Sequence, residues 1–246
     1  STTTDNSYNG SNLTIIARNA LNITGKVLVE GGNTTSTGDP GSGGYVNITA
    51  NQFLVHGELS ARGGFGSSTQ AVAGGNATAI WVNASLVRIT GNVSAQGGSG
   101  SSTCGAAQGE RGHGGNISIN ANTSIVIESP GILNASRGSV GGCNDGCGGY
   151  INITAPAVDL RGGNLTALGF GNTSSQNGTV FIQYVDNLTF DSVGNVTPGP
   201  TIARTSSFGR IRYLEAVTGY VTINFTNNIS ITNNSAVGDA ATASGL

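Results

Sequence analysis

The chain has 246 residues and a net charge of −2, and its composition differs from that of an ordinary soluble domain. Gly accounts for 41 residues, roughly one in six against an average near 7%. Charged residues make up only 9%, against an average near 25%. The lack of basic excess argues against a nucleic-acid partner, and no apolar run is long enough to predict a membrane span. Five prolines without a three-residue Gly period exclude collagen.

Three regions follow one another along the chain. We predict a polar N-terminal extension over 1–12, a Gly-rich repeat region over 13–186 and a C-terminal β region over 187–246. Met is absent, so Ser1 is expected to be a mature terminus left after removal of a signal peptide. The C-terminal region is richer in aromatic residues, and we expect it either to cap the solenoid or to contact a second subunit.

The repeat region contains five segments that begin with Gly, then any residue, then Val or Leu. They start 32, 34, 40 and 32 residues apart, at Gly25, Gly57, Gly91, Gly131 and Gly163. Alternating segments such as 45–50 and a second apolar run such as 53–55 precede these glycines. Period-2 alternation is typical of half-buried strands, so Val46 and Ile48 should face the core and Asn47 the solvent.

The repeat predicts an all-β fold, a parallel β-helix or β-solenoid of about five to six coils, each with about three short strands and one long loop. A β-sandwich is the alternative, but its turns should recur every 8–12 residues. The recurring Ala50, Ala84, Ala121 and Ala155 are expected at a tight interior corner. Gly at the corners is expected to adopt positive φ at little steric cost.

Aligning the five Gly-initiated segments brings side chains of different coils into common columns. Glu30, Arg62, Gln96 and Leu168 share one column, with Arg137 one place later. We therefore expect Glu30 and Arg62 to pair between coils, with a contribution of about 0–1 kcal/mol. An arginine ladder for an anionic ligand is the alternative, but the column is too mixed to favour it.

Two features of the repeat resemble a known family, namely the segment Tyr45–Ala50 (Tyr-Val-Asn-Ile-Thr-Ala) after Gly-Gly and the Gly-initiated segments. The family is that of the Gly-rich parallel β-helix repeats found in large surface proteins of archaea and some bacteria. The resemblance covers roughly residues 13–186. It implies a secreted or surface-anchored structural or adhesive protein. The composition is also similar to that of archaeal extracellular filament subunits.

The motif Asn-X-Ser/Thr is about three times more frequent than the chance expectation of roughly 6 for N-glycosylation acceptors. Glycans would replace charge as the solubilising layer. The alternative is that Asn serves in turns and Thr in strands for structural reasons. The predicted acceptors are Asn9, Asn12, Asn22, Asn33, Asn47, Asn76, Asn83, Asn92, Asn116, Asn122, Asn134, Asn152, Asn164, Asn172, Asn177, Asn187, Asn195, Asn224, Asn228 and Asn233.

The chain has three cysteines, Cys104, Cys143 and Cys147. Stacked coils would bring Cys104 and Cys143 together, and we predict that these two form a disulfide, worth typically about 2–4 kcal/mol. Pairings with Cys147 are the alternatives. A further alternative is a zinc ion bound by the three thiols and His113, but disulfides are more common than such sites in secreted proteins.

No motif of known catalytic chemistry stands out. Asp186 and Asp191 are the nearest carboxylate pair, but they lack a matched basic column, so no enzyme activity and no cofactor are expected. We expect an extracellular, N-glycosylated structural subunit whose partners are its own copies and covalent N-glycans. A carbohydrate-binding adhesin, with surface glycans as partners, is the second interpretation, and a polysaccharide-processing β-helix enzyme is the third.

Overall fold

The computed structural model describes residues 7–35, 38–66, 72–100, 112–138, 146–169, 177–189, 196–204, 210–211 and 222–225. Within these ranges every regular element is a β-strand. The strands are β1 (Leu13–Ile23), β2 (Lys26–Leu28), β3 (Val46–Val55), β4 (Glu58–Ser60), β5 (Ala79–Ile89), β6 (Asn92–Ser94), β7 (Asn116–Ile127), β8 (Ile132–Asn134), β9 (Tyr150–Asp159), β10 (Asn164–Thr166), β11 (Thr179–Thr189), β12 (Val196–Thr197), β13 (Thr201–Arg204), β14 (Arg210–Ile211) and β15 (Thr222–Phe225).

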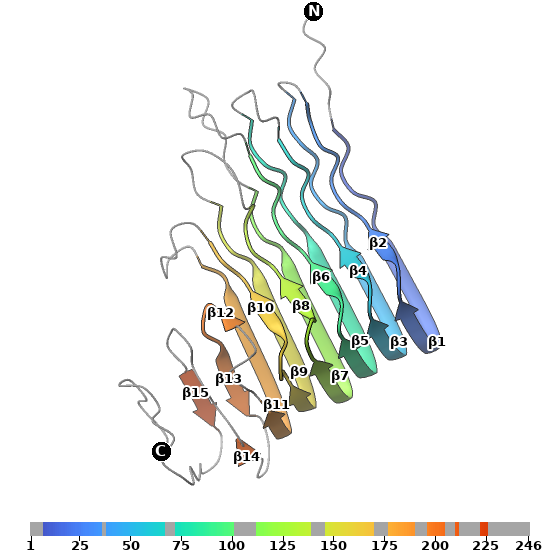
Figure 1. The fold of residues 1–246 in the computed structure, drawn as a ribbon, viewed down its shortest axis with the longest axis vertical. Helices are drawn as coiled ribbons and strands as arrows, with labels where there is room; N and C mark the ends of the chain where they lie inside the picture. The colour runs from blue at the N-terminus through green and yellow to red at the C-terminus, as the bar shows by residue number, and fades with distance from the viewer. Residues whose placement is uncertain are drawn as a thin grey trace, which may run out of the picture.

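The strands alternate between two parallel sheets, so the chain winds as a β-solenoid (Figure 1). The long sheet has the order β1-β3-β5-β7-β9-β11-β13-β15, with β14 beside β11, and the short sheet has the order β12-β10-β8-β6-β4-β2. The predicted all-β parallel solenoid is thus confirmed, and the β-sandwich alternative is wrong. The solenoid has about four turns, slightly fewer than the five to six predicted.

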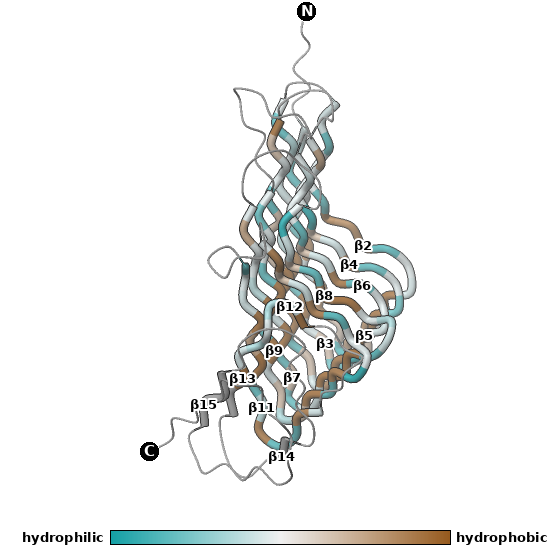
Figure 2. The backbone as a smooth tube through the Cα atoms, turned by 60° about the vertical axis from the view of Figure 1, so that its left-hand side comes forward, coloured by the Kyte–Doolittle hydropathy of each residue, from teal (hydrophilic) through white to brown (hydrophobic). Residues whose placement is uncertain are grey.

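Each repeat has two strands rather than the three predicted. The predicted run 45–50 and the run 53–55 are parts of one strand, β3, whose register with β1 shifts between them. The burial of β3 alternates because its side chains point in turn into the space between the sheets and out to solvent. Val46, Ile48 and Phe53 are fully buried. In Figure 2 the hydrophobic stretches follow the strands of the wider part of the molecule.

The five predicted repeat glycines do lie in one column. The short-sheet register aligns Lys26 with Glu58, Glu58 with Asn92, Asn92 with Ile132 and Ile132 with Asn164, each one residue after its glycine. The alanine column Ala50, Ala84, Ala121 and Ala155 is buried, as predicted. It lies within the long strands near their register shifts, however, and not at a corner between strands.

The glycines of the narrow part of the molecule form a separate hydrogen-bonded stack, in which segments leaving the short sheet alternate with segments returning to the long one (Figure 2). Each N–H donates to the carbonyl oxygen of the glycine before it in the stack, at 2.8–3.1 Å. A Cβ at Gly98 would lie 1.8 Å from the Gly64 carbonyl oxygen, so only glycine fits there. The stack consists of Gly32, Gly41, Gly64, Gly75, Gly98, Gly112 and Gly138.

This stack corrects the predicted reason for the glycines. Among the described glycines, only Gly162 has a positive φ, of 76°. At the corners, a Cβ at Gly57 would lie 2.0 Å from the Gly25 carbonyl oxygen, and one at Gly91 would lie 2.1 Å from that of Gly57. Glycine is therefore required at these positions because the backbones of neighbouring coils approach each other closely. A left-handed backbone conformation is not the reason.

The C-terminal strands continue the long sheet. β13 pairs in parallel with β11, and β15 pairs in parallel with β13. The cap or subunit contact expected of 187–246 stays a prediction. The described residues include no helix long and apolar enough to span a membrane.

The glycine stack predicts a large difference between two Gly→Ala variants. Gly98→Ala should lower the free energy of unfolding by about 3 kcal/mol or more, because its Cβ meets backbone that cannot move aside. A Cβ added at Gly25 has nothing within 4 Å, so Gly25→Ala should change the free energy of unfolding by less than about 1 kcal/mol. Urea unfolding of the two variants measures this, and equal losses would contradict the stack.

Candidate functional site

The outer face of the long sheet presents Asn-X-Ser/Thr motifs in a regular way. Asn47 and Thr49 are exposed, whereas Ile48 between them is fully buried. Because side chains of a strand alternate between its two faces, the first and third residues of the motif point outward together. β7 and β9 repeat the arrangement around Ile117 and Ile153. A half-buried strand thus presents the acceptor amide and its hydroxyl on the same side.

No sequon asparagine whose burial the structure describes is buried. The exposed ones are Asn9, Asn12, Asn22, Asn33, Asn47, Asn76, Asn83, Asn116 and Asn122, and the partly exposed ones are Asn92, Asn134, Asn152, Asn164, Asn177 and Asn187. Asn172, Asn195, Asn228 and Asn233, as well as the side chain of Asn224, lie outside the described part. The predicted outward facing of Asn47, Asn92, Asn152 and Asn164 agrees with these exposures.

Several sequon asparagines also hold neighbouring coils together. Oδ1 of Asn9 accepts the Ser42 backbone N–H at 2.8 Å, and Oδ1 of Asn76 accepts that of His113 at 2.9 Å. In the same way Oδ1 of Asn12 accepts from Tyr45, and Oδ1 of Asn33 from Phe65. Asn therefore has a structural role at these positions. That role is the alternative to glycosylation as an explanation for the abundance of Asn.

These hydrogen bonds also orient the amide. A backbone N–H can only donate, so the amide atom that it meets must be Oδ1. The amide nitrogen Nδ2 then lies on the other side of the same carbon, and Nδ2 is the atom that carries an N-linked glycan. The structural use and a glycan therefore do not compete for the same atom.

Charged side chains pair between coils. Glu30 and Arg62 are 2.8 Å apart, which confirms the predicted contact, and Lys26 and Glu58 are 3.1 Å apart. The Nε of Arg88 lies 2.6 Å from Oε1 of Glu128. Because the partners are largely on the surface, each pair adds about 0–1 kcal/mol. Charges that are paired in this way do not form an arginine ladder.

Among the predicted metal and thiol residues, the structure describes Cys147 and His113. Cys147 is exposed with a free thiol, and its backbone N–H donates to Nδ1 of His113 at 3.0 Å. Cys104 and Cys143 lie outside the described residues, so their disulfide stays a prediction. No cluster of three His, Cys, Asp or Glu able to hold a metal occurs within the ranges given above.

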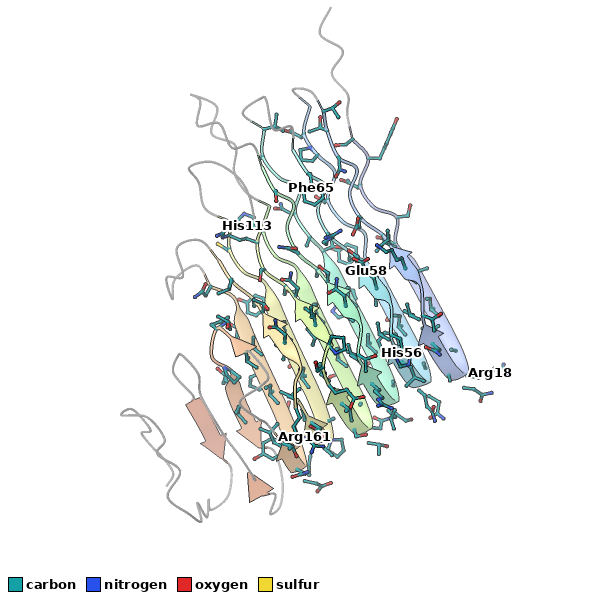
Figure 3. The ribbon with its side chains drawn as sticks, viewed as in Figure 1. Arg18, His56, Glu58, Phe65, His113 and Arg161 are labelled. Carbon is teal, nitrogen blue, oxygen red and sulfur yellow. The ribbon has the colours of Figure 1, made fainter. Side chains whose placement is uncertain are left out.

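Of the carboxylate pair considered for catalysis, Asp186 is exposed on β11, and Asp191 lies outside the described part. Figure 3 shows His113 among the Gly-rich segments, far along the coil from His56 and Arg161. His56 Nδ1 lies 2.8 Å from the Thr90 hydroxyl oxygen, one coil away. This contact joins two coils and brings no carboxylate to the imidazole, so the described histidines do not form a catalytic pair with Asp186.

A group of exposed aromatic side chains was not singled out from the sequence. Tyr45 and Trp81 stack with their centroids 5.6 Å apart and their planes at 18°, on the outer face of the long sheet. Phe65 and Tyr150 are also exposed. Tyr45 and Tyr150 both follow Gly-Gly at the start of a repeat strand, which was a usable signal. The contact with Trp81 depends on the register between coils.

Comparison of the chain with family models, curated proteins and solved structures gives no match.

The carboxyl of Asp159 has a pKa that depends on one neighbour. Burial raises this pKa, but hydrogen bonds and positive charge from Arg161 outweigh burial and hold it below its ordinary value. Nη2 of Arg161 lies 2.6 Å from Oδ2 of Asp159. The pair therefore stabilises the fold above the unfolded-state pKa near 3.9, and this contribution is lost as the pH falls through the folded-state pKa.

Arg161→Ala should raise the pKa of Asp159, because the variant loses the hydrogen bonds and the positive charge of the guanidinium, and burial is then opposed only by the backbone N–H of residue 161. An NMR titration of the Asp159 carboxyl measures the change. Arg88→Ala is the control, because Arg88 pairs with Glu128 instead. A pKa that stays as low in Arg161→Ala as in the wild type would show that the guanidinium of Arg161 is not the cause.

Proposed function

We propose that this chain is a secreted, heavily N-glycosylated structural protein of the cell surface, which assembles head to tail into a filament or surface layer. Its partners are further copies of itself and covalently attached glycans. Its role is mechanical and protective, with no catalysis. The observation that carries the proposal is that no sequon asparagine of described burial is buried, although the chain has 20 sequons.

The exposure of these asparagines supports glycosylation because a glycan cannot enter a packed core. In the transfer, Nδ2 of Asn loses a proton and bonds to the anomeric carbon of a saccharide carried on a lipid phosphate. The bond from that carbon to the phosphate oxygen breaks, and the phosphate leaves with the electron pair. A hydrated glycan layer then compensates for the 9% charge content of the chain.

The N-terminal end of the solenoid supports head-to-tail assembly. β1 and β2 each have a neighbour on one side only among the described strands. The inward-facing Leu13 and Ile15 of β1 are only half-buried, whereas Val46 and Ile48, their partners in β3, are fully buried. Unpaired strand edges with apolar side chains readily add further strands. Since all coils are parallel, the last coil of another copy extends both sheets without reversal, as an open head-to-tail contact requires.

Glycosylation is tested on protein purified from its own cells. We expect an intact mass well above the 24.5 kDa of the polypeptide, which falls to that value after complete deglycosylation. Glycopeptide mass spectrometry then assigns the occupied asparagines. A bare polypeptide would overturn the glycosylation part of the proposal and leave the assembly part standing.

Assembly is tested by charge at the open end. Ile15→Lys should abolish polymers in negative-stain microscopy, because it places a charge on the apolar end face. Ile16→Lys is the matched control, since Ile16 points outward from the same strand and is 77% exposed. Circular dichroism and thermal unfolding confirm that both variants fold. Monomers in the wild type, or polymers of folded Ile15→Lys, would reject this contact.

The second candidate function is carbohydrate binding by a surface adhesin. The stacked Tyr45 and Trp81 favour it, since exposed aromatic rings contact ligands with an apolar face. On the strands around this pair the outward residues Asn47, Thr49 and Ser118 are uncharged, which suits a neutral saccharide. An adhesin predicts monomers that bind a glycan array and lose binding in Trp81→Ala, whereas the structural subunit predicts polymers without such binding.

A further inference from the structure

Four exposed aromatic side chains share a kind of neighbour, whereas Tyr8, the other exposed aromatic among the described residues, precedes β1 in the first coil and is not part of this group. Tyr45, Phe65, Trp81 and Tyr150 are 47%, 41%, 42% and 60% exposed. Each lies directly beside a sequon asparagine of the preceding coil. The pairs are Asn12 with Tyr45, Asn33 with Phe65, Asn47 with Trp81 and Asn116 with Tyr150.

Two kinds of observation place these pairs. In the long sheet, the register puts Asn47 opposite Trp81 and Asn116 opposite Tyr150. For the other two pairs, the backbone N–H of the aromatic residue donates to the asparagine, at 3.0 Å from Tyr45 to Asn12 and at 2.8 Å from Phe65 to Asn33. Neighbouring parallel strands are about 4.8 Å apart, so each acceptor amide lies within one strand spacing of the aromatic residue.

The hydrogen bonds leave Nδ2, the atom that would carry the glycan, available. Oδ1 of Asn12 and Oδ1 of Asn33 are held by the next coil, so Nδ2 of each points away from the backbone. A sugar joined to Nδ2 therefore begins within about one strand spacing of the aromatic residue. One face of a pyranose ring consists of C–H groups, which pack on an aromatic face, while its hydroxyl groups meet uncharged side chains such as Thr49 and Ser118.

We infer that the first saccharides on Asn12, Asn33, Asn47 and Asn116 lie against the exposed parts of the aromatic rings of Tyr45, Phe65, Trp81 and Tyr150. Tyr45 and Trp81 also stack on each other and Arg62 lies over Phe65, so each saccharide takes the surface that these contacts leave open. The inference rests on the proposed N-glycosylation, and the bonds made and broken are those given above. Each glycan then bridges two coils, covers apolar surface and is held close to the solenoid. The occupant of these aromatic surfaces is the sugar of this chain rather than a separate ligand.

Trp81 is the single tryptophan of the chain, so its fluorescence reports on one pair alone. The full chain is produced in its own cells as wild type, Thr49→Ala and Thr49→Ser. Thr49→Ala removes the sequon while keeping the Asn47 side chain, and Thr49→Ser keeps the sequon. Thr24→Ala, which removes the sequon of Asn22, is a second control, because Asn22 lies opposite Leu54, seven residues along β3 from Asn47. Glycopeptide mass spectrometry measures occupancy, and acrylamide quenching measures exposure of the indole.

We expect a saccharide on Asn47 in the wild type and in Thr49→Ser, and none in Thr49→Ala. The quenching constant should rise about twofold in Thr49→Ala, since a pyranose covers an area similar to one aromatic face. The quenching constant should stay unchanged in Thr49→Ser and in Thr24→Ala. Deglycosylation of the folded wild type should give the same rise, which covers the case in which Thr49→Ala fails to fold.

Other outcomes separate this inference from the proposed function. Unchanged quenching despite an occupied Asn47 overturns the packing of sugar on Trp81, while glycosylation stands. An empty Asn47 with other sequons occupied also overturns this inference alone. Protection of Trp81 that depends on protein concentration assigns the ring to contact with a second copy and overturns it too. A chain without any glycan overturns both.

Discussion

The architecture depends on backbone hydrogen bonds between coils at a distance that admits no side chain. In the narrow part of the molecule the glycine stack from Gly32 to Gly138 brings one backbone directly onto the next. A single Cβ at Gly98 would meet the Gly64 carbonyl oxygen at 1.8 Å. In the wider part, apolar side chains fill the space between the sheets instead. The coil is thus held by backbone hydrogen bonds between glycines at one end and by a hydrophobic core at the other.

The same stacking shapes the surface. Each residue acquires a neighbour about one coil away in sequence, so a short motif becomes part of a column. Glu30 meets Arg62 in this way, and sequon asparagines meet backbone N–H groups or aromatic rings of the next coil. A surface of amides, hydroxyls and scattered rings with few charges suits a covalent sugar layer, on which the proposed structural role depends.

Local periodicity predicted some features of the solenoid and missed others. The alternation around Ile48 and the five aligned glycines predicted the strands, their outward faces and the register of the short sheet. The merging of two runs into β3 was missed, because a register shift inside a strand resembles a turn in the sequence. The role of glycine was assigned to positive φ, since close approach between coils cannot be inferred from one coil alone.

By itself the sequence determined the repeat, the parallel solenoid and the outward facing of the sequons, because these follow from local periodicity and alternation. Only the tertiary structure decided which residues meet across coils. The repeats differ in length, 40 residues between Gly91 and Gly131 against 32 or 34 elsewhere. The partner of Trp81 is therefore fixed by inter-coil hydrogen bonding, a long-range constraint that no local pattern contains. That constraint is the reason the pairing of sugar acceptor with aromatic ring became visible only in three dimensions.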